Sequence, residues 1–211
     1  LCEIGCGWGG FAELVARQER FRIHGITLSK AQLERAQQRT KQYRNSVSLT
    51  LTDYRDLTHI YDRIISIEMF EAVGEAHWKA FFQTLQRCLK RGGIAVLQII
   101  CIAEERFAAY RRNIDFIQRY IFPGGMLPTI SIVRKLTQQY GFQMVTEQSI
   151  GQSYAKTLSL WRQNFLAATK AINNLGLDQQ FQRMWEYYLA YCESGFRHQS
   201  TDVWIFKLLR P

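Results

Sequence analysis

Apolar and polar positions along the first hundred residues follow a strand–helix rhythm. Short apolar runs predict buried strands at 1–6, 21–28, 46–53, 62–69 and 94–102. Amphipathic stretches predict intervening helices at 11–18, 29–43 and 77–93. Ser29 is the expected N-cap of the second helix, and Gly92 and Gly93 are expected to end the third. This alternation predicts an α/β fold with a mostly parallel sheet and helices on both faces.

The rhythm changes after residue 103. One helix is expected over 104–120, followed by a loop at 121–128. The rest of the chain predicts a helix and a strand within 131–151, two long helical stretches across 155–197, and a last strand at 201–210. Without an evident linker, residues 1–211 are interpreted as a single domain with a seven-stranded sheet and a helical insertion at about 104–128.

Composition narrows the function only in part. The 211 residues carry a net charge of +9, which favours a polyanionic partner such as nucleic acid or an anionic membrane face, with a merely solvated basic surface as the alternative. The five cysteines have no paired spacing and are interpreted as buried apolar residues. The four histidines have no ligand spacing, so no metal site is predicted.

A glycine-rich turn, EIGCGWGG, follows the first predicted strand and allows a ligand to approach the backbone. A dinucleotide site would need G-x-G-x-x-G and an acid ending the second strand, but that strand ends in GITLSK. Glu3, just before the turn, instead favours a ligand with a cation or amine, such as S-adenosylmethionine (AdoMet). Ligands of such sheets bind beyond the carboxyl ends of the strands, which places Gly5, Thr27, Asp53 and Glu68 on one rim.

Several stretches together resemble the cyclopropane fatty acid synthase family of AdoMet-dependent methyltransferases, which includes the mycolic acid methyltransferases. They are EIGCGWGG, GITLSKAQ, DYRDL, YDRIISIEMFEAVG, RYIFPGGMLP, SYAKTLSLW and FQRMWEYYLAYCESGFR. They span almost the whole chain in the family's order. The resemblance implies a Rossmann-like class I AdoMet methyltransferase fold. It also implies that an N-terminal segment, which carries an active-site cysteine in the family, is missing, so the chain is expected to be truncated.

The resemblance assigns cofactor roles to residues near the first two strands. Gly5 and Gly7 would lie beside the methionine part of AdoMet, with Glu3 just before them. Thr27, Leu28 and Gln32 would contact the ribose or lie near it, and an amide such as Gln32 can accept a hydrogen bond from a ribose hydroxyl.

A second group would contact the adenine. Asp53, Tyr54 and Arg55 match the stretch that encloses the base in the family, and Tyr54 could stack on the purine. A half-buried tyrosine at a strand end is the alternative interpretation of Tyr54.

The chemistry implied by the resemblance is methyl transfer from AdoMet to a cis double bond, which leaves a carbocation that must lose a proton. In the family a bound bicarbonate is thought to be the base. Glu71, Tyr154 and the carbonyl of Ile67 match its expected ligands. Gln98 stands where the family has histidine; it can still donate to bicarbonate but cannot titrate near neutral pH. The product could therefore be a cyclopropane or a methyl- or methylene-branched fatty acid.

The expected substrate is an unsaturated phospholipid at an anionic membrane surface. The enzyme would then be cytoplasmic, associated peripherally with the inner membrane face, without a nucleic-acid partner, and a homodimer is an option. Two alternatives stay open. One is a methyltransferase of a small molecule or RNA, against which EMFE after the fourth strand counts because amino-methylating enzymes tend to have an Asn/Asp-Pro-Pro-Tyr motif there. The other is an inactive AdoMet-binding module.

Overall fold

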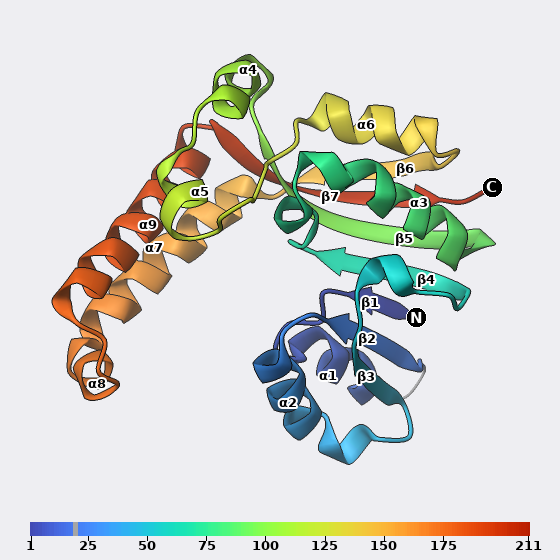
Figure 1. The fold of residues 1–211 in the computed structure, drawn as a ribbon, viewed down its shortest axis with the longest axis horizontal. Helices are drawn as coiled ribbons and strands as arrows, with labels where there is room; N and C mark the ends of the chain where they lie inside the picture. The colour runs from blue at the N-terminus through green and yellow to red at the C-terminus, as the bar shows by residue number, and fades with distance from the viewer. Residues whose placement is uncertain (19–20) are drawn as a thin grey trace.

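A seven-stranded sheet organises the computed structural model, which describes residues 1–18 and 21–211 (Figure 1). Its strand order is β3-β2-β1-β4-β5-β7-β6. The strands are β1 (Cys2–Ile4), β2 (Ile23–Thr27), β3 (Val47–Leu51), β4 (Tyr61–Ile67), β5 (Leu89–Ile102), β6 (Gln143–Ser149) and β7 (Thr201–Leu209). β7 runs antiparallel to both of its neighbours, β5 and β6, and the other paired strands are parallel. The predicted α/β class, strand number and mostly parallel sheet are confirmed.

Helices and short turns connect these strands. The helices are α1 (Gly10–Arg17), α2 (Lys30–Arg39), α3 (Trp78–Cys88), α4 (Glu104–Arg112), α5 (Phe116–Tyr120), α6 (Ile130–Gln139), α7 (Gly151–Ala167), α8 (Thr169–Asn174) and α9 (Gln179–Arg197). Short 3-10 turns are η1 (Lys41–Tyr43), η2 (Tyr54–Asp56), η3 (Phe70–Val73) and η4 (Glu75–His77). The Ser29 hydroxyl accepts from the backbone N–H of Gln32, as expected for the N-cap of α2.

Side chains of the strands alternate between two faces of the sheet, and helices cover both. The register aligns Cys2 of β1 with Ile64 of β4, and Ile64 with Ala95 of β5. These three lie in the large buried cluster that also contains residues of α3 and α6. Ile23 of β2 belongs instead to the cluster formed with α1 and α2, and Val203 of β7 to the cluster formed with α7 and α9.

The strand order reverses between β1 and β4, which lie side by side in parallel. Gly5 follows β1 directly and Glu68 follows β4 directly, while Thr27 ends β2 and Asp53 lies two residues beyond β3. Because parallel strands end at the same edge, the predicted shared rim of these four residues is confirmed. Ligands of open α/β sheets bind at such a reversal point.

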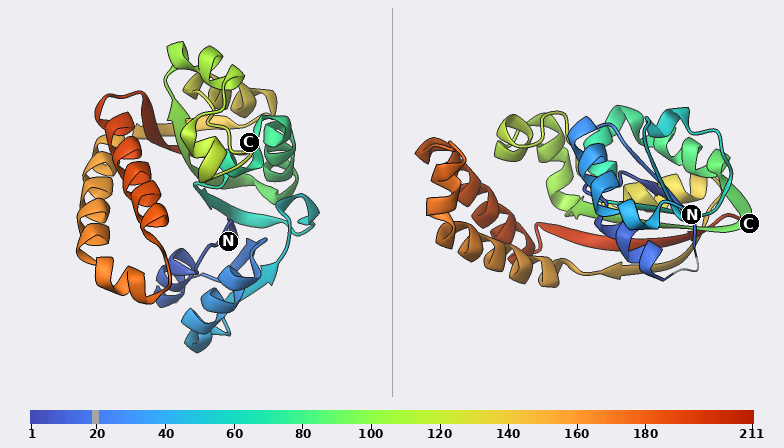
Figure 2. Two further views of the ribbon diagram at one scale, coloured as in Figure 1. Left: turned by 60° about the vertical axis from the view of Figure 1, so that its left-hand side comes forward. Right: turned by 90° about the horizontal axis from the view of Figure 1, so that it is seen from below.

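A pair of long helices, α7 and α9, extends beyond the end of the sheet and is joined through α8 (Figures 1 and 2). Its buried side chains include Leu158 of α7 and Phe196 of α9. The short helix α5 packs against α9, since the rings of Phe116 and Tyr187 lie edge to face with centroids 4.6 Å apart. The two long helical stretches predicted after residue 150 are confirmed.

Two predicted helix limits were wrong. Helix α3 ends at Cys88 rather than at the glycines, because Cys88 and Leu89 are fully buried and Leu89 already pairs with Tyr61 of β4. Gly92 and Gly93 instead lie within β5, where Gly92 adopts φ 72°.

The helix predicted over 104–120 is also interrupted. It forms α4 and α5, because the Asp115 side chain accepts from the backbone N–H of Gln118 and begins a new helix with a capping box. Ile114 lies between the two helices and is 77% exposed.

Candidate active site

The glycine turn follows β1, leads into α1 and lies against the segment that follows β4. The backbone N–H groups of Gly5 and Cys6 donate to the carbonyl of Ile26 at 3.0 and 2.8 Å, which fixes the turn against β2. Gly5 adopts φ 85°, and a Cβ there would lie 2.9 Å from Cγ of Met69. Such an approach is open only to glycine. The turn after β1 therefore abuts the segment that follows β4.

Glu3 lies beneath this turn and is only 3% exposed. Its Oε2 is buried and has no hydrogen-bond partner among the described residues. Burial raises the pKa of Glu3 to about 8, because the charged carboxylate loses its hydration. A cationic ligand group that reached this carboxylate would supply the missing partner and favour ionisation.

The end of β2 presents a hydroxyl and an amide. The Thr27 hydroxyl donates to Oε1 of Gln32 at 2.9 Å, so the two predicted ribose residues are paired with each other. Leu28 beside them is 70% exposed at the rim. The amide of Gln32 still has donors for a ligand. The structure thus brings these three candidates together.

The segment after β3 is already engaged within the protein. Arg55 donates to both carboxylate oxygens of Asp53, at 3.0 and 2.7 Å, and this hydrogen bonding lowers the pKa of Asp53. The Tyr54 ring is buried and packs edge-on against Phe81, with centroids 5.6 Å apart. The adenine contact of this segment stays a prediction, and the ring of Tyr54 belongs to the main core.

Glu71, in η3, is a second buried acid. Its Oε1 accepts from the backbone N–H of Ile100 at 2.5 Å, while its Oε2 is buried without a hydrogen-bond partner among the residues described. Burial raises the pKa of Glu71 to about 8, and the charge of Glu68 adds to the shift. Glu71 is therefore a carboxyl that changes charge near neutral pH, a property common at catalytic sites.

Gln98, Tyr154 and Glu68 form a hydrogen-bonded group drawn from three elements. Nε2 of Gln98 donates to Oε1 of Glu68 at 2.8 Å and to the Tyr154 hydroxyl at 2.7 Å. The Tyr154 hydroxyl also donates to Oε1 of Glu68. Ile67, whose carbonyl was a candidate ligand, is the register partner of Gln98 between β4 and β5. Two of the four predicted catalytic residues, Gln98 and Tyr154, thus meet, and we call Glu68, Gln98 and Tyr154 the carboxylate group.

Glu68 is the residue that sequence reasoning placed on the rim but did not assign to the site. Its signal was an acid directly after a buried strand, at the reversal of strand order. Nothing in the sequence pattern indicated that Tyr154, 86 positions later, would donate to it.

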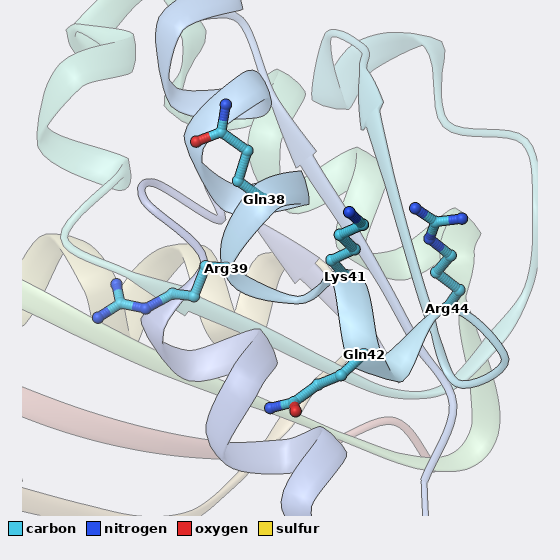
Figure 3. Close-up of a pocket in the computed structure, with 5 residues that line it drawn as sticks. All are labelled: Gln38, Arg39, Lys41, Gln42 and Arg44. Atoms are coloured by element: carbon cyan, nitrogen blue, oxygen red, sulfur yellow. The ribbon is translucent and has the colours of Figure 1, made fainter.

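Neither of two surface depressions is lined by the candidate site residues. One is at the end of α2 and is lined by Gln38, Arg39, Lys41, Gln42 and Arg44, whose side chains point in different directions (Figure 3). The other lies where β5 and β7 meet α4 and α9, and its lining includes Asp202 and Trp204. Among the residues that the structure describes, no group of three histidines, cysteines or acids could hold a metal ion. No helix in the same part of the chain is long and apolar enough to cross a membrane.

Comparison with known proteins identifies the family. The sequence profile described as "Mycolic acid cyclopropane synthetase" matches residues 1–206. This chain belongs to the mycolic acid cyclopropane synthetase family. A tuberculostearic acid methyltransferase, UfaA1, from Mycobacterium tuberculosis is 39% identical over all of this chain and half of that protein. The cyclopropane-fatty-acyl-phospholipid synthase of Escherichia coli K12 is 36% identical over 97% of this chain and 51% of its own length.

Solved structures of this cyclopropane synthetase family agree with the fold. The mycolic acid cyclopropane synthase CmaA1 complexed with SAH and CTAB has a TM-score of 0.89 and 31% identity, covering 98% of this chain and 76% of that one. MmaA2 from Mycobacterium tuberculosis has a TM-score of 0.87 and 28% identity over 98% and 76% of the two chains. The fold is that of class I AdoMet methyltransferases. The chain spans about half the length of UfaA1 and of the Escherichia coli synthase.

Proposed function

We propose that this chain forms the catalytic part of an enzyme that transfers the methyl group of AdoMet to the cis double bond of an unsaturated phospholipid acyl chain. The product is a cyclopropane or a methyl- or methylene-branched fatty acid. The observation that carries the proposal is the contact between Gly5 and Met69, which joins the glycine turn to the segment bearing Glu68 and Glu71. The proposed cofactor site and the proposed catalytic residues then lie at the same edge of the sheet, where strand order reverses.

The residues at the rim fit AdoMet. The orphaned buried oxygen of Glu3 suits the ammonium of the methionine part, and a Cβ at Gly7 would meet nothing within 4 Å, which leaves room beside the turn. Thr27 and Gln32 suit the ribose hydroxyls. Bound AdoMet supplies a methyl group carried on a positively charged sulfur. The turn and Glu3 would hold the methionine part of AdoMet at the edge of the sheet that also carries the carboxylate group.

Glu71 suits the stabilisation of positive charge on the acyl chain. It is buried, its pKa lies near neutral, and only one of its oxygens is used within the protein. An ionised carboxylate fixed in a dry site stabilises a nearby cation far more than it would in water. The ionised form of Glu71 would therefore lower the barrier to methyl transfer.

Aromatic rings supply an apolar wall for an acyl chain. Tyr154 packs on Phe196 at 5.5 Å between centroids, and Phe122 packs on Tyr188 at 6.2 Å. The pKa of Tyr188 is raised mainly by burial and also by the charge of Glu68. Rings beside the carboxylate group would exclude water and present π faces to a cation.

The insertion between β5 and β6 suits an anionic phospholipid surface. Ile114 is 77% exposed, and Tyr120 and Phe122 are each 55% exposed. Arg112 and Arg119, on α4 and α5, are also exposed. Apolar side chains beside arginines favour binding at the inner membrane face, where the headgroups are anionic.

The test uses the full-length protein that contains this chain. It is incubated with methyl-labelled AdoMet and vesicles of cis-unsaturated phosphatidylglycerol, and the lipids are identified by mass spectrometry and NMR. Label is expected in a cyclopropane or branched acyl chain, and none is expected with vesicles of saturated lipid. Label in added RNA or in a small amine, with none in lipid, would contradict the proposal.

A further inference from the structure

Glu68 has an unusual backbone conformation for its residue type. Its φ is 51°, and among the described non-glycine residues only Gln199 shares a positive φ. This left-handed conformation is unfavourable for a side chain other than glycine, so the surrounding structure must hold it. The backbone N–H of Glu68 donates to the carbonyl of Gln98 at 2.9 Å, which fixes the turn beside β5. Strain of this kind is found preferentially at functional sites.

The conformation directs the carboxylate to two donors that were expected to serve another group. Gln98 and Tyr154 were predicted to hold a bicarbonate ion, but both donate to Oε1 of Glu68. Tyr154 remains a donor at neutral pH because burial and the hydrogen bond to Glu68 raise its pKa. The protein's own carboxylate therefore occupies the position prepared for an anion.

A separate bicarbonate does not fit beside Glu68. Its two expected donors are engaged by Glu68, and a further anion would be repelled by the Glu68 carboxylate. We derive no step through bicarbonate for this reason.

We propose that Glu68 is the catalytic base that removes the proton from the methylated acyl cation, in place of bicarbonate. This inference rests on the proposed function. Both hydrogen bonds fall on Oε1, so Oε2 is the oxygen that takes the proton. Glu68 is half-buried, so its carboxylate can meet a substrate. Gln98 and Tyr154 act as positioning residues.

The step balances in atoms and charge. Methyl transfer forms a carbon–carbon bond from the alkene electron pair, and the sulfur–carbon pair returns to sulfur. A C–H bond beside the cationic carbon then breaks, and its electron pair forms either the ring-closing bond or a new double bond. The proton passes to Oε2 of Glu68. The cation and the carboxylate become a neutral lipid and a carboxylic acid, which releases its proton to water.

The alternative is that Glu68 only ties α7 to the sheet through Tyr154. Such a structural role would affect folding stability but would not make turnover depend on an added base. The variants Glu68→Gln and Glu68→Gly separate the two roles, because glutamine keeps an acceptor for Tyr154 and glycine tolerates φ 51° while leaving space for a small anion. Glu105→Gln, at an exposed acid of α4, is the matched control.

The experiment measures lipid methylation by the full-length protein in bicarbonate-free buffer and after addition of bicarbonate or formate. AdoMet affinity and unfolding temperature are measured in parallel. The unsubstituted protein is expected to turn over equally with and without bicarbonate. Glu68→Gln should lose about 100-fold or more of turnover, the usual range for a lost general base, while still binding AdoMet. Added bicarbonate or formate should restore part of the activity of Glu68→Gly, and Glu105→Gln should behave as the unsubstituted protein.

Three results would overturn the inference. One is a requirement of the unsubstituted protein for bicarbonate, which decides the matter even if the variants fail to fold. The second is full turnover in Glu68→Gln, and the third is a Glu68→Gly variant that no small anion rescues. If the unsubstituted protein is active, any of these results excludes Glu68 as the base but leaves the proposed function in place. An unsubstituted protein that methylates no lipid under any condition removes the proposed function and this inference together.

Discussion

The two sides of the candidate site are built in different ways. The cofactor side, from Glu3 to Gln32, uses neighbouring parts of the sequence, with a turn after β1 and a hydroxyl–amide pair at the end of β2. The carboxylate side combines Glu68 from the end of β4 with Gln98 of β5 and Tyr154 of α7. The first side is local, and the buried Oε2 of Glu3 has no hydrogen-bond partner among the described residues. The second is non-local, and Glu68, Gln98 and Tyr154 are hydrogen-bonded to one another, while Oε2 of the nearby Glu71 is also buried without a partner among those residues. The difference indicates that the cofactor side depends on local sequence, whereas the fold must bring the groups of the carboxylate side together.

The substitution expected to have the largest effect on this comparison is Glu71→Gln, on the carboxylate side. Glutamine has the same shape and can still accept from Ile100, so the fold should remain. Loss of the fixed negative charge should lower turnover by about 100-fold or more, with AdoMet affinity nearly unchanged. Steady-state methylation rates and calorimetric AdoMet binding check this. A variant with full turnover would remove Glu71 from the mechanism.

The same variant gives a pH test. The pKa of Glu71 is raised to about 8, so its carboxylate is mostly neutral at lower pH and ionises as pH rises through that value. If the ionised form is the active one, kcat should rise with pH up to about 8, and the rise should be absent from the residual activity of Glu71→Gln. A flat profile in the unsubstituted protein would contradict this role of its charge.

On the cofactor side, Glu3→Gln should weaken AdoMet binding about tenfold at pH above about 8, in keeping with the loss of one charge-assisted hydrogen bond. The pKa of Glu3 is raised to about 8 by burial, and the ligand cation favours the ionised form. Affinity of the unsubstituted protein, relative to the variant, should therefore grow as pH rises to about 8 and then level off. Isothermal titration calorimetry at several pH values measures the ratio of the two AdoMet affinities. Protonation of the ligand affects both proteins equally and therefore cancels in this ratio. Glu34→Gln, at an exposed acid of α2, is the control.

A smaller effect is expected from alanine at the two glycines of the turn. Gly5→Ala places a Cβ 2.9 Å from Met69 and at φ 85°, whereas Gly7→Ala at φ 51° meets nothing within 4 Å. Gly7→Ala should cost about 1 kcal/mol of folding free energy, and Gly5→Ala roughly 2–3 kcal/mol, because it adds a clash to the backbone strain. Urea unfolding compares them. Equal losses would mean that the turn and the segment after β4 are not tightly packed.

The contrast between the two sides also explains what could be predicted from the sequence. Ser29 as a cap, the glycine turn and the shared rim depend on short-range patterns that sequence periodicity reveals. The early end of α3 depends on the pairing of Leu89 in β5 with Tyr61 in β4. Local sequence patterns do not indicate this pairing. The break between α4 and α5 has a local signal in the capping box of Asp115, but the sequence pattern over 104–120 predicts one continuous helix.

The candidate site divides in the same manner. Positions of Gln98 and Tyr154 followed from the family resemblance, but their shared partner did not, because it depends on the distance between α7 and the end of β4 in the folded chain. The burial of Tyr54 against Phe81 likewise depends on the packing of η2 against α3. Contacts between elements distant in sequence were thus the part that required the structure.

The central claim is that the two sides form one site at the reversal between β1 and β4. The most direct test is a crystal structure of the full-length protein with S-adenosylhomocysteine and an unsaturated lipid analogue. The account predicts the ligand's amino group on the carboxylate of Glu3 and its sulfur facing the space between Glu71 and the carboxylate group, with the acyl chain in that space. A ligand bound elsewhere, or a sulfur directed away from Glu68 and Glu71, would contradict it.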